Sequence, residues 1–173
     1  MRPTLYLLIE GPLDSKFFSR SLNSRLRKKY RKILRLLYAR ESKELIEGFI
    51  NAGNTNANGE IIFVHDFDNG PCFTQIKTNL TTKYRTLCPD CIIISKKEIE
   101  SWLLAGVTKN VADELGIGTS NLRTDNIGKI GFNKLKPRNM PLKQFENTLL
   151  GCFNVRNAER RNCSFNYFIN NFF

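Results

Sequence analysis

Asp66 and Asp68 form the pair of residues whose types and spacing point most directly to chemistry. They follow Ile61–Val64, an apolar run with the composition of a buried strand. Side chains alternate between the two faces of a strand, so both carboxylates are expected on one face, with His65 on the other as a structural residue. Carboxylates held together repel each other, and a hard cation such as Mg²⁺ or Mn²⁺ relieves that repulsion through oxygen ligands. The pair therefore predicts a metal site.

Two further acids are expected near this pair. Glu10 directly follows the apolar run Leu5–Ile9 and would complete the cluster from a second strand end. Asp14 comes one helical turn later and could approach the same ion. Each acid has a simpler alternative. Glu10 could be solvated or paired with a lysine, and Asp14 could interact with the dipole of its own helix from the first turn.

These acids can meet only if strands and helices alternate along the chain. Gly11 and Pro12 end the first apolar run, and apolar residues then recur at helical spacing from Leu13 to Leu26. The other expected elements are strands at 33–39, 61–64 and 92–94 and helices at 43–52, capped by Ser42, and at 73–84. This alternation predicts an α/β fold: a Rossmann-like, mainly parallel sheet flanked by helices. Such sheets bind ligands at the carboxyl ends of their strands, which is where the acids are expected.

The pattern changes near Glu98. Helices are expected at 98–105, 109–115, 141–153 and 157–172, with an irregular segment rich in Gly, Asn and Lys at 116–138. Ile99, Trp102 and Leu103 fall on one stripe of the first of these helices, so Trp102 is expected to pack in a core. The predicted organisation is an α/β core at 1–106 and a mostly helical C-terminal extension at 107–173, packed on that core.

Three segments resemble the Toprim domain family. Leu8–Phe18 resembles the Toprim signature: an apolar strand, Glu-Gly, then a helix with an acid four residues after the Glu. Ile61–Asp68 resembles the Toprim D-x-D strand, although His65 and Phe67 are bulkier than the residues usual there. Lys97–Ala105 is similar to the E-x-W-L-L segment of small Toprim-like relatives of the overcoming-lysogenization-defect nucleases. The resemblance covers roughly residues 5 to 105.

The resemblance implies roles for individual residues. Glu10 would act as general acid or base, and Asp66 and Asp68 would bind Mg²⁺. Asp14 would match the acid that the nuclease branch uses for an additional ion, and Glu100 matches the glutamate of the Trp segment. A nuclease would also need to stabilise charge on the scissile phosphate, a role for which the candidates are Lys96 and Lys97.

The expected function is therefore metal-dependent cleavage of nucleic-acid phosphodiester bonds. One or two Mg²⁺ or Mn²⁺ ions would activate water and stabilise the developing charge. The alternative is a non-catalytic nucleic-acid-binding or regulatory module with a Toprim fold that needs a partner. The sequence leaves open whether DNA or RNA is bound, and whether a protein partner or a homo-oligomer is formed.

The charge balance favours a polyanionic partner. The chain has 27 Lys and Arg residues against 16 Asp and Glu residues, for a formal net charge of +11. From Arg20 to Lys43 there are ten basic residues and one acid, Glu41. Nucleic acid is the expected partner, an anionic membrane surface a less frequent one, and a solvated basic helix face the alternative. The candidate phosphate-contacting residues are Arg25, Arg27, Lys28, Lys29, Arg31, Lys32 and Arg35.

Hydropathy and cysteine usage give weaker indications. No apolar run approaches the ~20 residues that span a bilayer, and Leu5–Ile9 is shorter than a signal-peptide core, so a soluble cytoplasmic protein without membrane contact is expected. Cys88 and Cys91 have metal-ligand spacing and could bind zinc with Cys152 and Cys163. A disulfide is a second possibility, and small buried hydrophobic residues a third.

Overall fold

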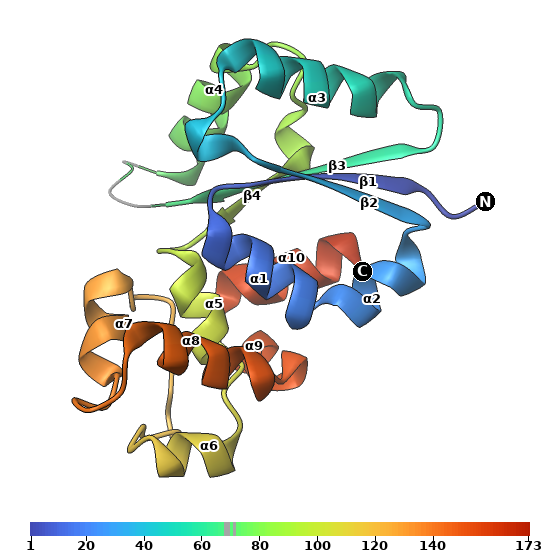
Figure 1. Cartoon of the computed structure of the whole chain (residues 1–173). Helices are drawn as coiled ribbons and strands as arrows, with labels where there is room; N and C mark the ends of the chain where they lie inside the picture. The colour runs from blue at the N-terminus through green and yellow to red at the C-terminus, as the bar shows by residue number, and fades with distance from the viewer. Residues whose placement is uncertain (68–69, 71) are drawn as a thin grey trace. The chain divides into compact units, whose positions relative to one another are not determined.

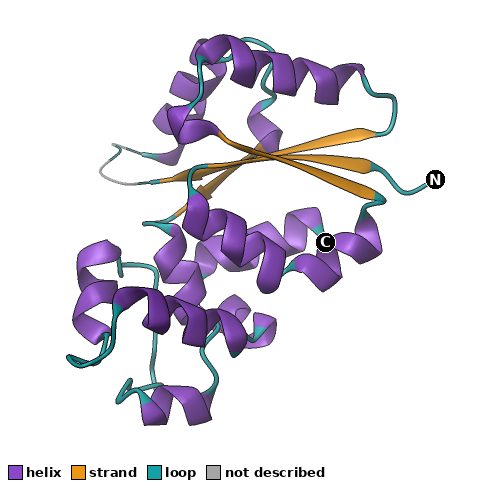
Figure 2. Ribbon diagram, in the orientation of Figure 1, coloured by secondary structure: helices purple, strands orange, loops and turns teal. Residues whose placement is uncertain are grey.

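The computed structural model describes residues 1–67, 70 and 72–173. Four strands form one parallel sheet in the order β2-β1-β3-β4 (Figures 1 and 2). Their bounds are β1 Thr4–Ile9, β2 Lys32–Leu37, β3 Gly59–Asp66 and β4 Ile92–Ser95. A parallel sheet flanked by helices confirms the predicted Rossmann-like α/β class.

The second strand ends earlier than predicted. The expected strand at 33–39 is β2, Lys32–Leu37, and Tyr38–Arg40 form the 3₁₀ turn η1. The backbone N–H of Glu41 donates to the carbonyl of Tyr38 at 3.1 Å, which closes this turn. The turn places Tyr38 at the carboxyl edge of the sheet.

The chain folds into two compact units. The first unit contains residues 1–18 and 22–94, and the second contains residues 19–21 and 95–173. The expected boundary after residue 106 therefore lies inside the second unit, which includes the helix of the Trp segment.

Four helices accompany the strands of the first unit: α1 Pro12–Arg20, α2 Asn23–Lys29, α3 Lys43–Thr55 and α4 Phe73–Lys83. The apolar spacing from Leu13 to Leu26 predicted one helix, and that prediction was wrong because the chain breaks at 21–22 and restarts as α2. Ser42 caps α3 as predicted, with its side chain accepting from the N–H of Leu45 at 3.3 Å.

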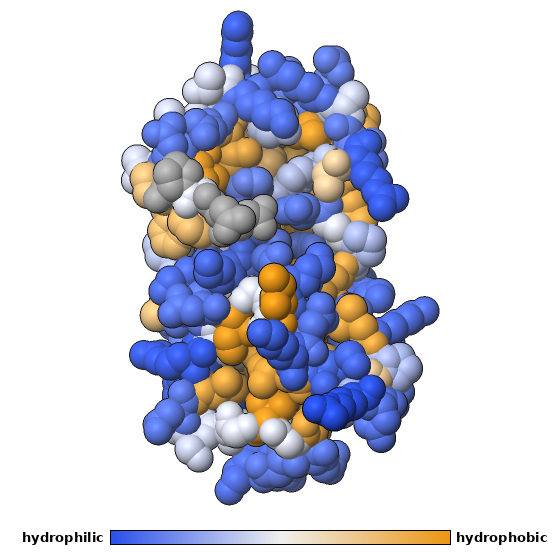
Figure 3. All heavy atoms as spheres, turned by 90° about the vertical axis from the view of Figure 1, so that its left-hand side faces the viewer, coloured by the Kyte–Doolittle hydropathy of each residue, from blue (hydrophilic) through white to orange (hydrophobic). Residues whose placement is uncertain are grey.

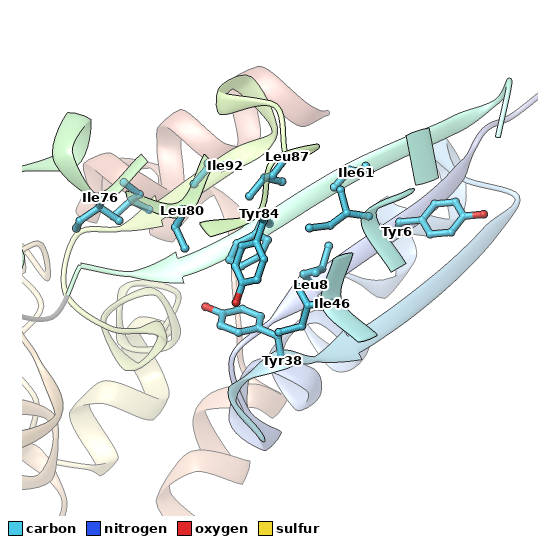
Figure 4. Close-up of a cluster of buried hydrophobic side chains, with 13 residues drawn as sticks. Tyr6, Leu8, Tyr38, Ile46, Ile61, Ile76, Leu80, Tyr84, Leu87 and Ile92 are labelled. Carbon is cyan, nitrogen blue, oxygen red and sulfur yellow. The ribbon is translucent and has the colours of Figure 1, made fainter. Parts of the chain in front are cut away.

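Strands β1, β3 and β4 of the sheet are buried on both faces, whereas the edge strand β2 is only half-buried. Tyr6 and Leu8 from β1 and Ile61 and Phe63 from β3 pack in one core cluster with residues of α3 and α4 (Figure 4). The alternate residues of the same strands, such as Leu7, point to the opposite face, where α1 and α2 lie (Figure 1). Burial on both faces explains why these strands read as continuous apolar runs.

The second unit is helical. Its helices are α5 Ile99–Ala105, α6 Lys109–Glu114, α7 Lys129–Leu135, α8 Leu142–Gly151, α9 Val155–Arg161 and α10 Cys163–Phe172. Two predictions were wrong here. The segment 116–138 was expected to be irregular but contains α7, and the single helix expected at 157–172 is two helices separated at Asn162.

Trp102 is a core residue, as predicted. It is 0% exposed, stacks on Phe168 with ring centroids 5.3 Å apart, and meets Phe165 edge-on at 5.3 Å. Its indole N–H donates to Ser164 Oγ at 2.8 Å. Within the part of the chain that is described, no helix is long and apolar enough to cross a membrane.

Candidate acidic site at the carboxyl edge of the sheet

Glu10 and Asp66 lie at the ends of neighbouring strands. Glu10 directly follows β1, and Asp66 is the last residue of β3, which pairs with β1 in parallel register. The chain leaves β1 towards β2 on one side, whereas β3 lies on the other side of β1. Open parallel sheets bind ligands where the strand order reverses in this way, so the two acids occupy the topological switch point.

Asp14 is held against the turn that follows Glu10. Its Oδ2 accepts a hydrogen bond from the backbone N–H of Gly11 at 3.1 Å, and the residue is 5% exposed. This is the return contact of a capping box, in which the third helical residue satisfies the N-cap N–H. Asp14 therefore has the helix-start role that the sequence offered as an alternative, while its other oxygen, Oδ1, is buried.

The Tyr38 phenol is influenced by three of the predicted acids. Burial raises the pKa of its phenol well above the ordinary value, and the charges of Glu10, Asp66 and Asp14 raise it further. Coulomb interactions weaken with distance, so the three carboxylates that act on this phenol lie in its neighbourhood. Glu10 Oε2, Asp14 Oδ1 and Asp66 Oδ1 are each buried. Glu10, Asp14 and Asp66 thus lie near one side chain, and their convergence with Asp68 on one ion stays a prediction.

The hydroxyl of Tyr38 is tied to the end of β3. It lies 3.1 Å from the carbonyl oxygen of Val64 and 2.9 Å from Nδ1 of His65. A phenol has one proton, so when that proton is donated to the carbonyl, the Nδ1–H of His65 donates to the phenol oxygen. This hydrogen bond joins His65 to Tyr38, and the structural role of His65 stays a prediction.

Sequence reasoning missed Tyr38. The residue follows the apolar residues of β2, so the sequence pattern placed it inside the predicted strand at 33–39. Its ring does pack in the core, at 4.6 Å from Phe63, and it lies beside Tyr84 (Figure 4). The signal that could have revealed it is chemical, because a buried tyrosine needs a hydrogen-bond partner for its hydroxyl. A tyrosine at a strand end is therefore a candidate neighbour of strand-end acids.

The other predicted site residues lie beyond this group. Asp68 lies outside the described residues. Lys96, Lys97 and Glu100 belong to the second unit, so their roles at the acidic site remain predictions. The backbone N–H of Lys96 donates to Ser164 Oγ at 3.1 Å, and the side chain of Lys97 is half-buried.

Glu100 has its own acidic surroundings in the second unit. It is 8% exposed, and its Oε1 lies 4.0 Å from Nζ of Lys129. Burial raises the pKa of its carboxyl, and the charges of Glu98 and Glu146 add to this, whereas a backbone hydrogen bond and Lys129 act in the opposite direction. Glu98 in turn accepts a hydrogen bond from the backbone N–H of Lys129.

The donor set at the carboxyl edge suits a hard cation. Glu10, Asp14 and Asp66 offer carboxylate oxygens, the ligands that Mg²⁺ and Mn²⁺ prefer over the nitrogen and sulfur ligands typical of zinc. Across the described residues, however, no group of three or more His, Cys, Asp or Glu side chains is arranged to hold a metal ion. Glu10, Asp14 and Asp66 lie near Tyr38, but among the described residues they do not form a closed set of metal ligands.

The basic residues lie at the opposite edge of the sheet. Arg27 and Lys28 are exposed on the last turn of α2, and Arg31 and Lys32 are exposed at the start of β2. Strand β2 has six residues, which separates its ends by about 17 Å at ~3.3 Å per residue. Figure 3 views the carboxyl edge, where much of the visible surface is hydrophilic.

Not every basic residue is available to a partner. Lys29 Nζ lies 3.0 Å from Glu60 Oε2 and 5.1 Å from the centre of the Tyr30 ring. Glu60 lies outside the segment 20–43, in which Glu41 is the one acid. The sequence therefore did not indicate that Glu60 pairs with Lys29. Arg35 is half-buried on β2, and its pKa is lowered by burial and by the charge of Arg27.

All five cysteines are free in the described chain. Cys91 is half-buried against the core cluster, and burial, followed by its contact with Cys88, raises its pKa to about 11. Cys88 and Cys91 belong to the first unit and Cys152 and Cys163 to the second. The interpretation of the cysteines as small buried hydrophobic residues was wrong for Cys72, Cys88 and Cys163, which are exposed, and Cys91 and Cys152 are only half-buried. The disulfide considered as an alternative is not formed.

Comparison of the chain with protein-family models, with curated proteins and with solved structures found no match. The Toprim resemblance rests on the three segments that carry its motifs, and the case for function rests on the geometry of this chain.

Proposed function

We propose that the carboxyl edge of the sheet is the acidic site of a metal-dependent enzyme that cleaves nucleic-acid phosphodiester bonds. The supporting observation is that Glu10 and Asp66 end neighbouring strands at the topological switch point, with Asp14 also near Tyr38. Asp68, two residues beyond Asp66 in the sequence, is included because of the D-x-D spacing. The proposal is confined to residues of the first unit.

In this proposal, Asp66 and Asp68 hold Mg²⁺ or Mn²⁺, with Glu10 and Asp14 completing the oxygen donors. A bound ion of this kind lowers the pKa of its water and neutralises charge on phosphate oxygens. The carboxylate of Glu10 accepts a proton from the attacking water, as a general base. The Tyr38 hydroxyl, hydrogen-bonded at the end of β3, keeps the backbone beside Asp66 in place.

A nucleic acid is the substrate class that matches the charge of the chain. The exposed residues Arg27, Lys28, Arg31 and Lys32 would contact phosphates about 17 Å from the acids. At about 3.4 Å per base pair, a strand of roughly five nucleotides covers that distance. A substrate longer than this can occupy the basic surface and the acidic site together. A cytoplasmic location, where such substrates occur, belongs to the same proposal.

The deciding experiment is cleavage of single- and double-stranded RNA and DNA by the full chain with Mg²⁺ or Mn²⁺. Asp66→Asn preserves the shape of the side chain and removes its charge. Loss of an outer-shell partner already costs about 10- to 100-fold, so losing a direct ligand is expected to lower the rate at least about 100-fold. The matched control is Glu41→Gln, which removes an exposed carboxylate just after η1. Full cleavage by Asp66→Asn would refute the proposal.

A second candidate is a nucleic-acid-binding module without turnover that works with a partner. Two observations favour it: the described acids lack a closed ligand cage, and the basic surface lies at the far edge of the sheet. This candidate predicts binding of RNA or DNA with no cleavage in Mg²⁺ or Mn²⁺. It also predicts equal binding by wild type and Asp66→Asn.

A further inference from the structure

The second unit contains a cavity that the proposed function does not use. Its volume is about 370 Å³. It lies between the segment 119–123, which precedes α7, and the end of α9. The lining residues are Thr119, Ser120, Asn121, Leu122, Arg123, Arg160 and Arg161. This volume falls within the range of small-molecule sites, and every described lining residue is neutral or basic.

Each of the three guanidinium groups is held in place by the protein. Arg161 Nη1 donates to the carbonyl oxygens of Val107 at 2.6 Å and Ala105 at 3.2 Å. Arg123 Nη1 donates to the carbonyl of Arg160 at 2.6 Å. Arg160 Nη2 donates to Asn157 Oδ1 at 2.8 Å. The two part-buried contacts of Arg161 constrain its side chain before any ligand arrives, which lowers the entropy that binding would cost, whereas the single contacts of Arg123 and Arg160 are exposed.

The anchored groups retain donors for a ligand. A guanidinium carries five N–H donors in a planar fork, so the anchoring bonds of Arg123, Arg160 and Arg161 use only part of each set. The hydroxyls of Thr119 and Ser120 add further donors at the same cavity. The residues that line the cavity therefore carry several hydrogen-bond donors that the anchoring bonds do not use.

The positive charge of the cavity has no compensating acid. Among the described residues, no carboxylate lies within ion-pair distance of Arg123, Arg160 or Arg161. The pKa of Arg161 is lowered by burial and then by the charge of its neighbour Arg160. Like charges gathered without an acid repel one another, and an anion placed among them removes that repulsion.

We propose that this cavity binds a phosphate group. Planar guanidinium forks match phosphate oxygens in a two-bond geometry, and hydroxyl groups complete such sites. The phosphate could belong to a small free anion or to a nucleic acid, and the recognised chemistry is the same in both cases. The proposal stands on residues of the second unit and does not depend on cleavage at the acidic site.

The test is calorimetric titration of the full chain at constant ionic strength. The probes are inorganic phosphate and one oligonucleotide prepared with and without a 5′-phosphate. Arg123→Gln and Arg160→Gln each remove a lining charge on an exposed side chain. The matched control is Arg156→Gln, which removes an exposed charge from α9 outside the cavity lining.

The lining variants are expected to weaken phosphate binding about tenfold or more, the usual effect of losing a charge-assisted hydrogen bond, while Arg156→Gln leaves it unchanged. Variant-sensitive binding of inorganic phosphate identifies a small anion as sufficient. Variant-sensitive binding of the oligonucleotide alone identifies a nucleic-acid phosphate. Absence of binding to every probe, or equal losses in the lining and control variants, would overturn the proposal. Cleavage activity does not enter either result, so the two proposals fail separately.

Discussion

Tyr38 connects the core of the first unit with its acidic edge. Its ring packs against Phe63, and its hydroxyl contacts Val64 and His65 immediately before Asp66. A single side chain therefore belongs both to the hydrophobic cluster and to the surroundings of the candidate site. The hydroxyl is the part that a conservative substitution can remove without changing the packing.

Tyr38→Phe is expected to lower the free energy of unfolding by about 1–3 kcal/mol, because it leaves buried groups of Val64 and His65 without their phenol partner. Urea denaturation followed by circular dichroism measures the change. Tyr167→Phe is the control, since Tyr167 is 52% exposed and should tolerate the change. Equal stability of Tyr38→Phe and wild type would show that the hydroxyl contacts are unimportant.

Glu100 offers a test of pH dependence. Burial raises the pKa of its carboxyl in the folded state, so the folded protein binds the proton more tightly than the unfolded chain. Folding stability must then fall as pH rises from the ordinary carboxyl pKa through the raised value. Glu100→Gln removes the buried charge and is expected to raise the melting temperature at neutral pH, with the difference disappearing near pH 4.

Thermal unfolding of Glu100→Gln across this pH range checks the prediction. Glu114→Gln, an exposed position on α6, is the control for loss of one negative charge. A melting temperature of Glu100→Gln that is lower than wild type at neutral pH would mean that the contact with Lys129 outweighs the cost of burying the carboxylate.

At the scale of elements, Asn162 joins several segments of the second unit. Its Oδ1 accepts from the N–H of Phe165 at 3.0 Å and from Ser164 Oγ at 2.8 Å. Its Nδ2 donates to Ser101 Oγ at 3.3 Å and Thr124 Oγ1 at 3.0 Å. This fully buried residue therefore caps α10 and also binds α5 and the segment before α7.

Asn162→Ala is expected to lower the free energy of unfolding by roughly 2–4 kcal/mol, the sum of a lost cap and several lost buried hydrogen bonds. Asn154 is a matched control because it caps α9 in the same way, accepting from the N–H of Asn157 at 3.0 Å, but is exposed. Asn154→Ala should cost only about 1 kcal/mol. Equal losses in the two variants, measured by urea denaturation, would show that the links to α5 add nothing.

At the scale of the whole molecule, nucleic-acid binding that results from the net charge of +11 has to be distinguished from binding by one particular surface. The exposed basic residues at the amino edge of the sheet are Arg27, Lys28, Arg31 and Lys32. Lys29 is expected to contribute less, because Glu60 neutralises it at 3.0 Å. This distinction comes from the structure and sharpens the choice of variants.

Replacing Arg27, Lys28 and Arg31 with Ala should weaken nucleic-acid binding similarly for all sequences. It should also flatten the slope of log affinity against log salt by up to roughly 3 units, at about −0.9 per duplex phosphate contact. Fluorescence anisotropy over a salt series provides the measurement.

A second triple variant, at Lys109, Lys134 and Arg138, removes the same charge from the second unit and serves as control. Equal losses in the two triple variants would assign binding to net charge. No loss in either would mean that the amino-edge residues form a solvated face.

The sequence by itself determined the elements and the acidic positions of the first unit. Apolar runs predicted all four strands, and the runs of β1, β3 and β4 are continuous because these strands are covered on both faces. The edge strand β2 is only half-buried and includes Lys32 and Arg35. Alternation with helices predicted the parallel sheet, and parallel strands bring their carboxyl ends to one edge. Glu10 and Asp66 could therefore be grouped from their positions in the chain alone. These inferences depend on local patterns, which a sequence displays directly.

Only the tertiary structure decided which distant residues meet. The contact of Tyr38 with His65, the pairing of Lys29 with Glu60 and the links made by Asn162 each join segments far apart in the chain. The strand order and the arginine-lined cavity also depend on segments that are far apart in the chain. Such contacts depend on how elements pack and not on the residues adjacent in sequence, so no local period or spacing encodes them.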